Sequence, residues 1–255
     1  MGIVNVTPDS FSDGGQFLEP AKAVAQARLL AEQGADILDI GAESTRPYGG
    51  MKAVDAEEEL MRLKPVLPDV VKAGIPVSVD TMKPKVAAWA LEQGAVILND
   101  VWGFQRDADM ARVAAEHGAT VVLMHNREKA DAAIDVLADI RDFFARSLDI
   151  AARANVARER IVLDPGIGFG KTPEQSIQAI ARLGELREFG LPLLMGLSRK
   201  RFMESVSPAP PDRRLGGSIA GNVMAALAGS DIVRVHDVAE TVQALRVMDA
   251  IRKAQ

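Results

Sequence analysis

The chain has no cysteine among its 255 residues. This absence excludes disulfide scaffolds, iron–sulfur clusters, thiol nucleophiles and zinc sites built on cysteine, and it permits a reducing compartment. Histidine is scarce as well, with three residues, and the sequence contains neither an H-x-H nor an HExxH pattern. We therefore expect no tightly held, protein-bound metal ion.

The chain also lacks an excess of positive charge and a targeting segment. Its 30 Lys and Arg residues against 35 Asp and Glu residues give a net charge of −5, whereas non-specific nucleic-acid binding needs clustered positive charge. The N-terminus has neither the basic region nor the long apolar core of a signal peptide. The most apolar stretch, residues 219–228, contains Asn222 and is too short to span a bilayer. We expect a cytoplasmic protein that binds neither nucleic acid nor membrane.

A short joint recurs along the chain: a helix-like run, a glycine, one or two further residues, and then a short apolar run. The joint glycines are Gly34, Gly74, Gly94, Gly118, Gly190 and Gly229. A glycine in the left-handed conformation ends many helices. The joint therefore predicts six helices that each end at a glycine and lead at once into a strand.

Eight strands and eight helices alternate in this pattern. The expected strands are residues 1–4, 37–40, 77–79, 96–98, 121–123, 161–163, 193–195 and 232–235. The expected helices are residues 21–33, 56–73, 85–93, 108–117, 134–154, 173–189, 218–228 and 238–253. Apolar strands indicate burial on both faces, as in parallel sheets. Eight such units favour a closed (β/α)8 TIM barrel of the α/β class, a single domain over residues 1–255, rather than an open doubly wound sheet.

Polar residues follow every expected strand, at the end where barrel enzymes carry their active sites. They are Asn5, Glu43, Asp80, Asn99, His125, Asp164, Ser198 with Lys200, and His236. One such residue alone would be interpreted as a capping group, but eight at one rim indicate a binding site. Asp100 and Asp237 keep the simpler interpretation as caps of the following segment. His117, at a helix end, is expected to be a cap. For His125 both interpretations stay open, a capping group or a residue of the binding site.

Asp80 and Asp164 are the two carboxylates at this rim that stand directly at strand ends. A carboxylate at the mouth of an apolar barrel is costly unless it is paired or hydrogen-bonded. Two carboxylates without a neighbouring histidine indicate recognition of a heterocycle that bears N–H donors. A general acid/base pair is the alternative.

The stretch from Asp164 to Thr172 is rich in glycine, yet it matches neither common phosphate motif. Pro165 stands where a Walker A loop needs glycine, and the glycine spacing differs from a dinucleotide fingerprint. The glycines predict a tight turn through which backbone approaches a ligand. Phe169 is expected to form a pocket wall, with plain core packing as the alternative.

Basic residues gather after the last two strands, where this fold often binds phosphate. Arg199, Lys200 and Arg201 follow the seventh strand, and Arg201 alone is interpreted as a solvated charge. Arg234 and His236 are two residues apart on the eighth strand, so we expect them to point the same way. Because Arg234 is buried in a strand, it needs a salt bridge or a bound anion.

The loops at residues 5–15 and 43–50 are rich in hydroxyl, amide, carboxylate and glycine groups, and we interpret them as lids over a substrate. A Mg²⁺ ion carried by a substrate phosphate is favoured over a resident metal.

Taken together and in order, eight motifs resemble the dihydropteroate synthase family of pterin-binding TIM barrels. The motifs are Asn5-Val-Thr-Pro-Asp-Ser-Phe-Ser-Asp-Gly-Gly15, Glu43-Ser-Thr-Arg-Pro47, Ser78-Val-Asp-Thr81, Asn99-Asp100, Met124-His125, Asp164-Pro-Gly-Ile-Gly-Phe-Gly-Lys-Thr172, Gly196-Leu-Ser-Arg-Lys200 and Arg234-Val-His-Asp-Val238. The resemblance implies a transferase of folate biosynthesis that is a target of sulfonamides. Such an enzyme condenses 6-hydroxymethyl-7,8-dihydropterin pyrophosphate with para-aminobenzoate and releases 7,8-dihydropteroate and pyrophosphate.

The resemblance also assigns roles to individual residues. It implies that the pterin is held by Asp80, Asn99, Met124, Asp164 and Lys200, and the pyrophosphate by Asn5, Arg234 and His236, with Mg²⁺ near Asn5 and Asp13. It implies that the aminobenzoate is framed by Thr45, Arg46, Pro47, Phe169 and Lys200. The implied catalytic set is Asn5, Asp13, Arg46, Lys200, Arg234 and His236. It further implies a homodimer through the side of the small-residue helix that contains Gly221 and Ala225.

The sequence departs from the usual family pattern at a few positions. Arg201 and Ser176 stand where the family often has Ser and Asn, and the loop that contains Tyr48 is longer than usual. The sequence starts at the first expected strand, whereas the family usually has a lead-in segment. Two alternatives to the synthase stay open: a barrel of the pterin- or methyltetrahydrofolate-binding methyltransferase type, and a non-catalytic pterin-binding homologue.

Overall fold

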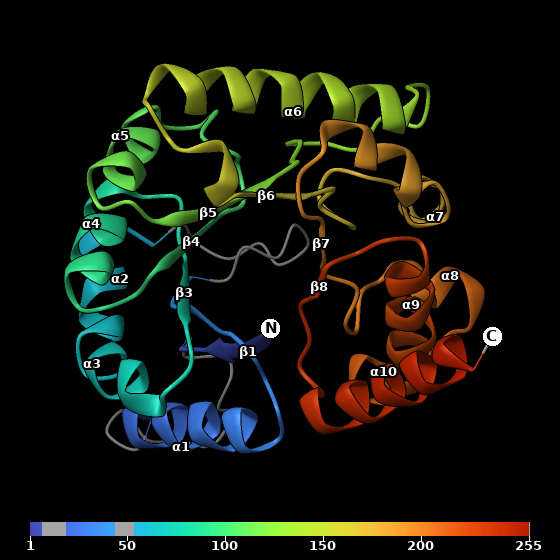
Figure 1. Cartoon of the computed structure of the whole chain (residues 1–255), viewed down its shortest axis with the longest axis horizontal. Coiled ribbons are helices and arrows are strands. Elements are labelled where there is room, and N and C mark those ends of the chain that lie inside the picture. The colour runs from blue at the N-terminus through green and yellow to red at the C-terminus, as the bar shows by residue number, and fades with distance from the viewer. Residues whose placement is uncertain (7–18, 44–53, 255) are drawn as a thin grey trace.

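Parallel strands line the centre of the molecule in the order of the sequence (Figure 1). The computed structural model describes residues 1–6, 19–43 and 54–254. One six-stranded sheet holds β1 (Gly2–Asn5), β2 (Leu38–Gly41), β3 (Val77–Asp80), β4 (Ile97–Asp100), β5 (Thr120–Met124) and β6 (Ile161–Asp164). The short strands β7 (Leu194–Met195) and β8 (Ile232–Val233) pair with each other, also in parallel.

Two backbone bridges join the two sheets into a closed ring. Leu163 of β6 pairs with Leu193, just before β7, and Gly2 of β1 pairs with Val235, just after β8. At the second junction the Ile3 amide donates to the Val235 carbonyl at 3.0 Å. The predicted (β/α)8 barrel is therefore confirmed, since every strand has a neighbour on both sides.

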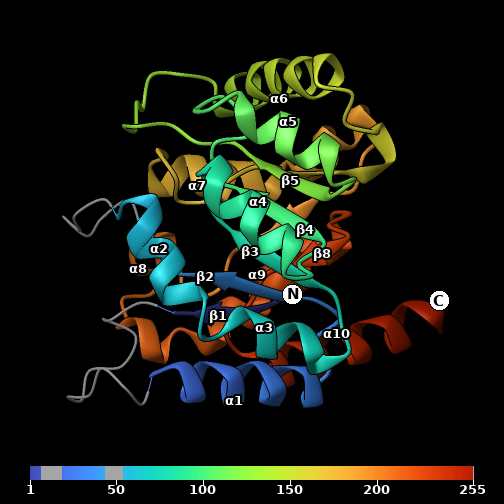
Figure 2. The same ribbon diagram turned by 90° about the vertical axis from the view of Figure 1, so that its left-hand side faces the viewer.

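Helices form the outer layer of the barrel, and Figure 2 shows α3 and α4 lying outside the strands. The helices are α1 (Glu19–Glu32), α2 (Ala56–Leu63), α3 (Leu67–Val70), α4 (Pro84–Glu92), α5 (Asp109–Glu116), α6 (Val136–Arg153), α7 (Pro173–Ala181), α8 (Phe202–Val206), α9 (Leu215–Leu227) and α10 (Val238–Lys253). Short 3-10 turns are η2 (Val71–Ala73), η3 (Arg158–Arg160), η4 (Leu183–Phe189) and η5 (Pro211–Arg213). No helix of the described ranges has the length and apolar character needed to cross a bilayer.

The helices differ from the prediction most clearly in four respects. The expected helix 56–73 is split into α2, α3 and η2, because Pro65 and Pro68 interrupt the backbone hydrogen bonds of a continuous helix. The expected helix 173–189 ends at Ala181 and continues as η4, a turn that contains Gly184. The sequence pattern also missed α8 and placed the start of α9 three residues late.

The glycine joints are confirmed. All six joint glycines have positive φ, from 58° at Gly118 to 105° at Gly94. Side chains disfavour this conformation, so glycine is required where a helix turns directly into a strand.

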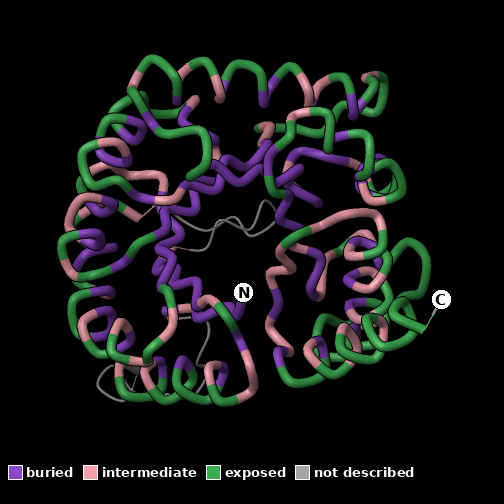
Figure 3. The backbone as a smooth tube through the Cα atoms, viewed as in Figure 1, coloured by how far each residue is buried: buried purple, intermediate pink, exposed green. Residues whose placement is uncertain are grey.

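Strand alternation decides which residues face the inside of the barrel. Leu98, Val121 and Leu163 belong to the core between strands and helices, so their chain neighbours point inward. The inward residues at the lower level form a separate apolar cluster, which includes Ile97, Val122, Val162 and Leu194. Figure 3 shows most of the strands buried, β8 partly exposed, and the outer sides of the helices exposed. Two residues further along β4 and β6, the inward positions are Asn99 and Asp164, so polar groups lie directly above an apolar floor.

Candidate active site

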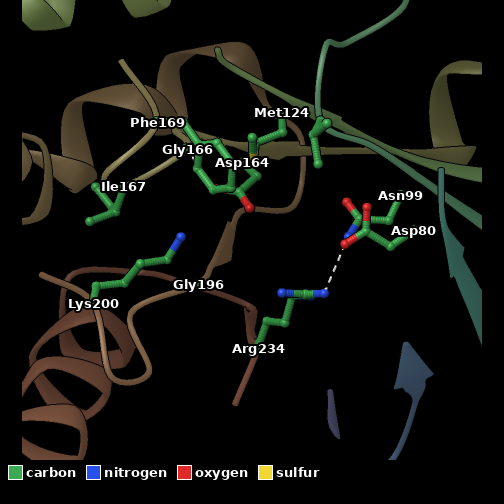
Figure 4. A pocket seen from close by; sticks show the side chains of 11 residues that line it. Asp80, Asn99, Met124, Asp164, Gly166, Ile167, Phe169, Gly196, Lys200 and Arg234 are labelled. Carbon is green, nitrogen blue, oxygen red and sulfur yellow. Dashed lines mark hydrogen bonds and ion pairs between the residues drawn. The ribbon is translucent and has the colours of Figure 1, made fainter. Parts of the chain in front are cut away.

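A cavity opens where the inward faces of the strands end (Figure 4). Its walls are Asp80, Asn99, Val101, Met124, Asp164, Gly166, Ile167, Phe169, Gly196, Lys200 and Arg234. Its volume is about 340 Å³ when the open mouth is included. Seven of these residues were predicted as substrate-binding: Asp80, Asn99, Met124, Asp164, Phe169, Lys200 and Arg234. The structure thus brings together residues that lie up to 154 positions apart.

One wall of the cavity presents hydrogen-bond acceptors. The side chains of Asp80 and Asn99 are buried, and in the described part of the chain neither Asp80 Oδ1 nor Asn99 Oδ1 has a hydrogen-bond partner. Burial raises the pKa of Asp80 to about 7; Arg234 opposes the rise and the Asp39 carboxylate adds to it. A buried acceptor without a partner is costly, so this wall is suited to a ligand that brings N–H donors.

Arg234 crosses the floor of the cavity between two carboxylates. Its Nε lies 2.5 Å from Asp39 Oδ2, and its Nη2 lies 3.0 Å from Asp80 Oδ2. The sequence predicted that Arg234 has either a salt bridge or a bound anion as its partner, and the salt bridge is confirmed. Asp39 Oδ2 also accepts a hydrogen bond from Asn99 Nδ2 at 3.2 Å.

Asp39 is a residue that sequence reasoning missed. It is fully buried in the middle of β2. The sequence did contain a signal for it, because an aspartate buried within the apolar run at residues 37–40 is costly unless a polar or charged group pairs with it. Its partners could not be identified from local pattern, since Asn99 and Arg234 are 60 and 195 residues away.

Asp164 and the turn after β6 form the opposite wall. Asp164 Oδ1 accepts the Gly166 amide at 2.7 Å. Burial raises the pKa of the Asp164 carboxyl, while the Gly166 amide and the positive charges of Lys200, Arg234 and Lys171 oppose that rise. Gly166 has a φ of 64°, and a Cβ there would lie 1.9 Å from the His125 carbonyl oxygen. The predicted tight turn is therefore confirmed, and Gly166 cannot be replaced without moving backbone.

Phe169 is a wall of the cavity, so the alternative of plain core packing is wrong. Lys200 Nζ lies 4.1 Å from the centre of the Phe169 ring, a cation–π arrangement. Figure 4 shows Phe169, Asp164 and Lys200 on one side of the cavity and Asp80 and Asn99 on the other. A flat ring between these walls would contact carboxylates at its edges and the aromatic and cationic groups at its mouth.

The loop that carries Lys200 is held from several sides. Arg199 has a φ of 60°, and its guanidinium pairs with Asp237, with Nη2 2.5 Å from Oδ1. Its amide donates to Ser218 Oγ at 2.9 Å, and the buried Arg214 donates to its carbonyl. Asp237 therefore binds Arg199 and makes no side-chain cap at α10, contrary to the expected capping role.

Three other simple interpretations have clear outcomes. Asp100 accepts the amides of Trp102 and Phe104, so its role as a loop cap is confirmed. His117 ends α5, and its Nδ1 lies 3.0 Å from the Val113 carbonyl, as expected for a helix-end residue. Ser176 is buried and donates to the Thr172 carbonyl, and it is not a wall of the cavity.

A second hollow lies beside the cavity, between β1, α1 and the segment after β8. It is lined by Ile3, Asn5, Lys22, Ala25, Gln26, Leu29, Arg199 and His236; we call it the Asn5 groove. Arg234 and His236 thus line different hollows. Both flank Val235, which belongs to the core between strands and helices and pairs with Gly2 of β1, and this agrees with the predicted common direction of the two side chains. His236 Nδ1 lies 2.9 Å from Ser198 Oγ.

The predicted metal and aminobenzoate residues are only partly described. Asn5 lies in the Asn5 groove, while Asp13, Thr45, Arg46 and Pro47 fall outside the described residues. Across residues 1–6, 19–43 and 54–254, no group of three His, Asp or Glu side chains could hold a metal ion. The Asn5 side chain has one oxygen atom that would serve as a ligand if a Mg²⁺ ion were bound mainly through other groups.

Comparisons with known proteins agree with this geometry. Residues 1–236 match the family described as "Pterin binding enzyme". Dihydropteroate synthase from Clostridium beijerinckii is 44% identical, over 98% of this chain and 93% of that protein. Dihydropteroate synthase from Clostridium difficile, solved with pteroic acid, superimposes with a TM-score of 0.94 at 47% identity, over 98% of this chain and 95% of that one. The enzyme from Xanthomonas albilineans in complex with 7,8-dihydropteroate gives 0.90 at 42% identity, over 98% and 92%. As the motifs indicate, the chain belongs to the dihydropteroate synthase family of pterin-binding enzymes.

Proposed function

We propose that this protein is a transferase that condenses 6-hydroxymethyl-7,8-dihydropterin pyrophosphate with para-aminobenzoate to give 7,8-dihydropteroate and pyrophosphate. The observation that carries the proposal is the cavity with seven expected substrate-binding residues above an apolar floor. Relatives solved with pteroic acid, 4-aminobenzoic acid and 7,8-dihydropteroate support it.

The pterin binds between the two walls of the cavity. Asp80, Asn99 and Asp164 accept hydrogen bonds from the N–H groups at the edge of the ring, and two of these residues have acceptor atoms without a partner in the described structure. Met124 and Ile167 contact the ring as apolar walls. Lys200 lies at the mouth, against Phe169, where it can also contact the second substrate.

The pyrophosphate leaves toward the Asn5 groove. This hollow adjoins the cavity and carries the side chains of Lys22, Arg199 and His236, which stabilise negative charge as it develops. Asn5, with Asp13, would contribute oxygen ligands to Mg²⁺, and the ion would neutralise phosphate charge when bound.

Bond cleavage comes before bond formation in the proposed reaction. The carbon–oxygen bond breaks, the pyrophosphate leaves with the electron pair, and the positive charge on the methylene carbon spreads into the pterin ring. The carboxylates of Asp80 and Asp164 stabilise this charge across the cavity. The aryl amine then forms the new carbon–nitrogen bond and gives up one proton, which the departing pyrophosphate can accept.

Incubation of the protein with both substrates and Mg²⁺ tests the proposal, with pyrophosphate release and 7,8-dihydropteroate formation measured together. Both products should appear in equal amounts, and both should form more slowly with an Asp164→Ala variant at limiting pterin concentration. A methyltransferase-type barrel would bind a reduced folate and release no pyrophosphate. A non-catalytic homologue would bind the pterin and form no product.

A homodimer through α9 and α10 is part of the proposal. Met224 and Leu227 on α9 and Val247 and Ile251 on α10 are each at least half exposed, and the two helices are in contact. Exposed apolar residues on adjacent helices are typical of an interface. Sedimentation analysis should give a dimer for the wild type and a monomer for a Met224→Glu, Ile251→Glu double variant; a monomeric wild type would contradict it. The cytoplasmic location stays a prediction.

A further inference from the structure

A buried chain of polar side chains lies behind the β6 turn, outside the cavity. Lys171 is 2% exposed. Its Nζ lies 2.6 Å from His125 Nδ1, 2.9 Å from the Gly166 carbonyl oxygen and 3.1 Å from the Phe169 carbonyl oxygen. Neither Lys171 nor His125 lines the cavity, so the proposed reaction leaves both residues without a role.

The geometry assigns the protons of this chain. An ammonium group has three donors and no acceptor, and Lys171 meets three acceptors. His125 Nδ1 must therefore accept, which places the ring proton on Nε2, 2.9 Å from Asp139 Oδ2. Burial lowers the pKa of His125 to about 4, with a further contribution from the Lys171 charge, which agrees with a neutral ring. Arg127 pairs with the same Asp139 oxygen at 3.0 Å and fixes the far end.

The two carbonyls bonded by Lys171 belong to residues that shape the cavity. The Gly166 amide donates to Asp164 Oδ1 at 2.7 Å, and the Phe169 ring lies against Lys200. One ammonium group thus holds both ends of the turn. Without it the Gly166 carbonyl would keep only the Phe169 amide, at 3.1 Å, and the Phe169 carbonyl would have to find another partner, which is costly for a polar group away from water. We expect the turn to shift and to move the Gly166 amide relative to the Asp164 carboxylate.

We propose that Lys171, held by His125 and Asp139, is a positioning residue that sets the Asp164 carboxylate and the Phe169 ring for the pterin. The identity of the ligand rests on the proposed function, whereas the proton arrangement does not.

The test is a double-mutant cycle on pterin affinity. Lys171→Met keeps an unbranched side chain, one atom shorter, and removes its three donors. Calorimetry with 6-hydroxymethylpterin near pH 6, below the pKa of Lys171 of about 7, should show affinity reduced about tenfold or more. In an Asp164→Asn background the same substitution should cost less than about threefold, because Lys171 acts through Asp164. Equal effects in both backgrounds would overturn the proposal.

Two further variants separate positioning from general destabilisation. Leu67→Ala removes a buried side chain from α3 and should lower the melting temperature while leaving pterin affinity unchanged. If pterin affinity falls in step with melting temperature in both variants, positioning by Lys171 is refuted. Asp139→Ala changes a partly exposed residue. If Lys171→Met does not fold, Asp139→Ala takes its place in the same double-mutant cycle. It should weaken pterin binding in the wild-type background and cost less in the Asp164→Asn background.

The histidine ring gives a readout that needs no ligand. The chain has three histidines, so the ¹⁵N signals of their ring nitrogens are readily assigned by NMR. His125 should be neutral with its proton on Nε2, and Lys171→Met should change the Nδ1 shift. A charged His125, or a proton on Nδ1, would contradict the network even if pterin binds. Failure of the wild type to bind any pterin would instead contradict the proposed function.

Discussion

Arg234 and Asp39 meet across the barrel from opposite ends of the sequence, with Nε 2.5 Å from Oδ2. The same guanidinium also pairs with Asp80, so two buried carboxylates share one cation. One negative charge is left over at the floor of the cavity. The pKa of Asp80 is raised although a cation contacts it, because burial opposes its ionisation most strongly and the Asp39 carboxylate adds to that effect.

Removal of Arg234 should weaken folding and pterin binding together. Arg234→Ala would leave Asp39 and Asp80 without their cation, and breaking a buried ion pair costs about 3–5 kcal/mol. We expect a clear drop in melting temperature and, in the same variant, a loss of affinity for 6-hydroxymethylpterin. An unchanged melting temperature with slow pyrophosphate release alone would show that Arg234 serves the leaving group and not the floor.

The ionisation of Asp80 should be visible in the pH dependence of stability. Its pKa is raised from 3.8 to about 7 in the folded protein, so the folded state binds more protons than the unfolded state between these values. The resulting stabilisation is complete below about pH 4 and is lost as the pH rises to about 7. Urea unfolding of wild type and Asp80→Asn across this range isolates the contribution. The wild type should lose more stability than the variant; parallel curves would contradict the shift.

Asp164→Ala should weaken pterin binding without unfolding the barrel. The substitution removes an acceptor for a ring N–H, and a hydrogen bond to a charged group is worth about 1.5–3 kcal/mol, or about tenfold to a hundredfold in affinity. Calorimetry with 6-hydroxymethylpterin measures the change. Asp69→Ala is a suitable control because Asp69 is exposed and pairs only with the neighbouring Lys72 in the described structure. Equal affinity in the Asp164 and Asp69 variants would remove Asp164 from the site.

Local sequence pattern was sufficient for the barrel and for one wall of the site. The joint glycines mark where helices end, and strand alternation puts Asn99 and Asp164 on the inner face, because both features depend on neighbouring residues. Local pattern could not identify the partners of Arg234, because they depend on which strands close the ring, and Asp39 is 195 residues away in the sequence. Local pattern predicted that Arg234 and His236 point the same way, but it could not show that the two residues line different hollows.

The different lining of the two hollows leads to a separation of function between them. His236 lines the Asn5 groove and contacts Ser198, whereas Arg234 lines the pterin cavity. His236→Gln should therefore weaken product inhibition by pyrophosphate, because the variant removes the imidazole ring that lines the Asn5 groove. The affinity for 6-hydroxymethylpterin, which carries no phosphate, should stay within about twofold of the wild type, because the substitution leaves the pterin cavity intact.

Arg234→Ala gives the reverse pattern, with pterin affinity lost first. Inhibition kinetics with pyrophosphate and calorimetry with the pterin, run on both variants, decide the matter: if both variants lose both ligands equally, the two hollows act as one site and the separation is wrong.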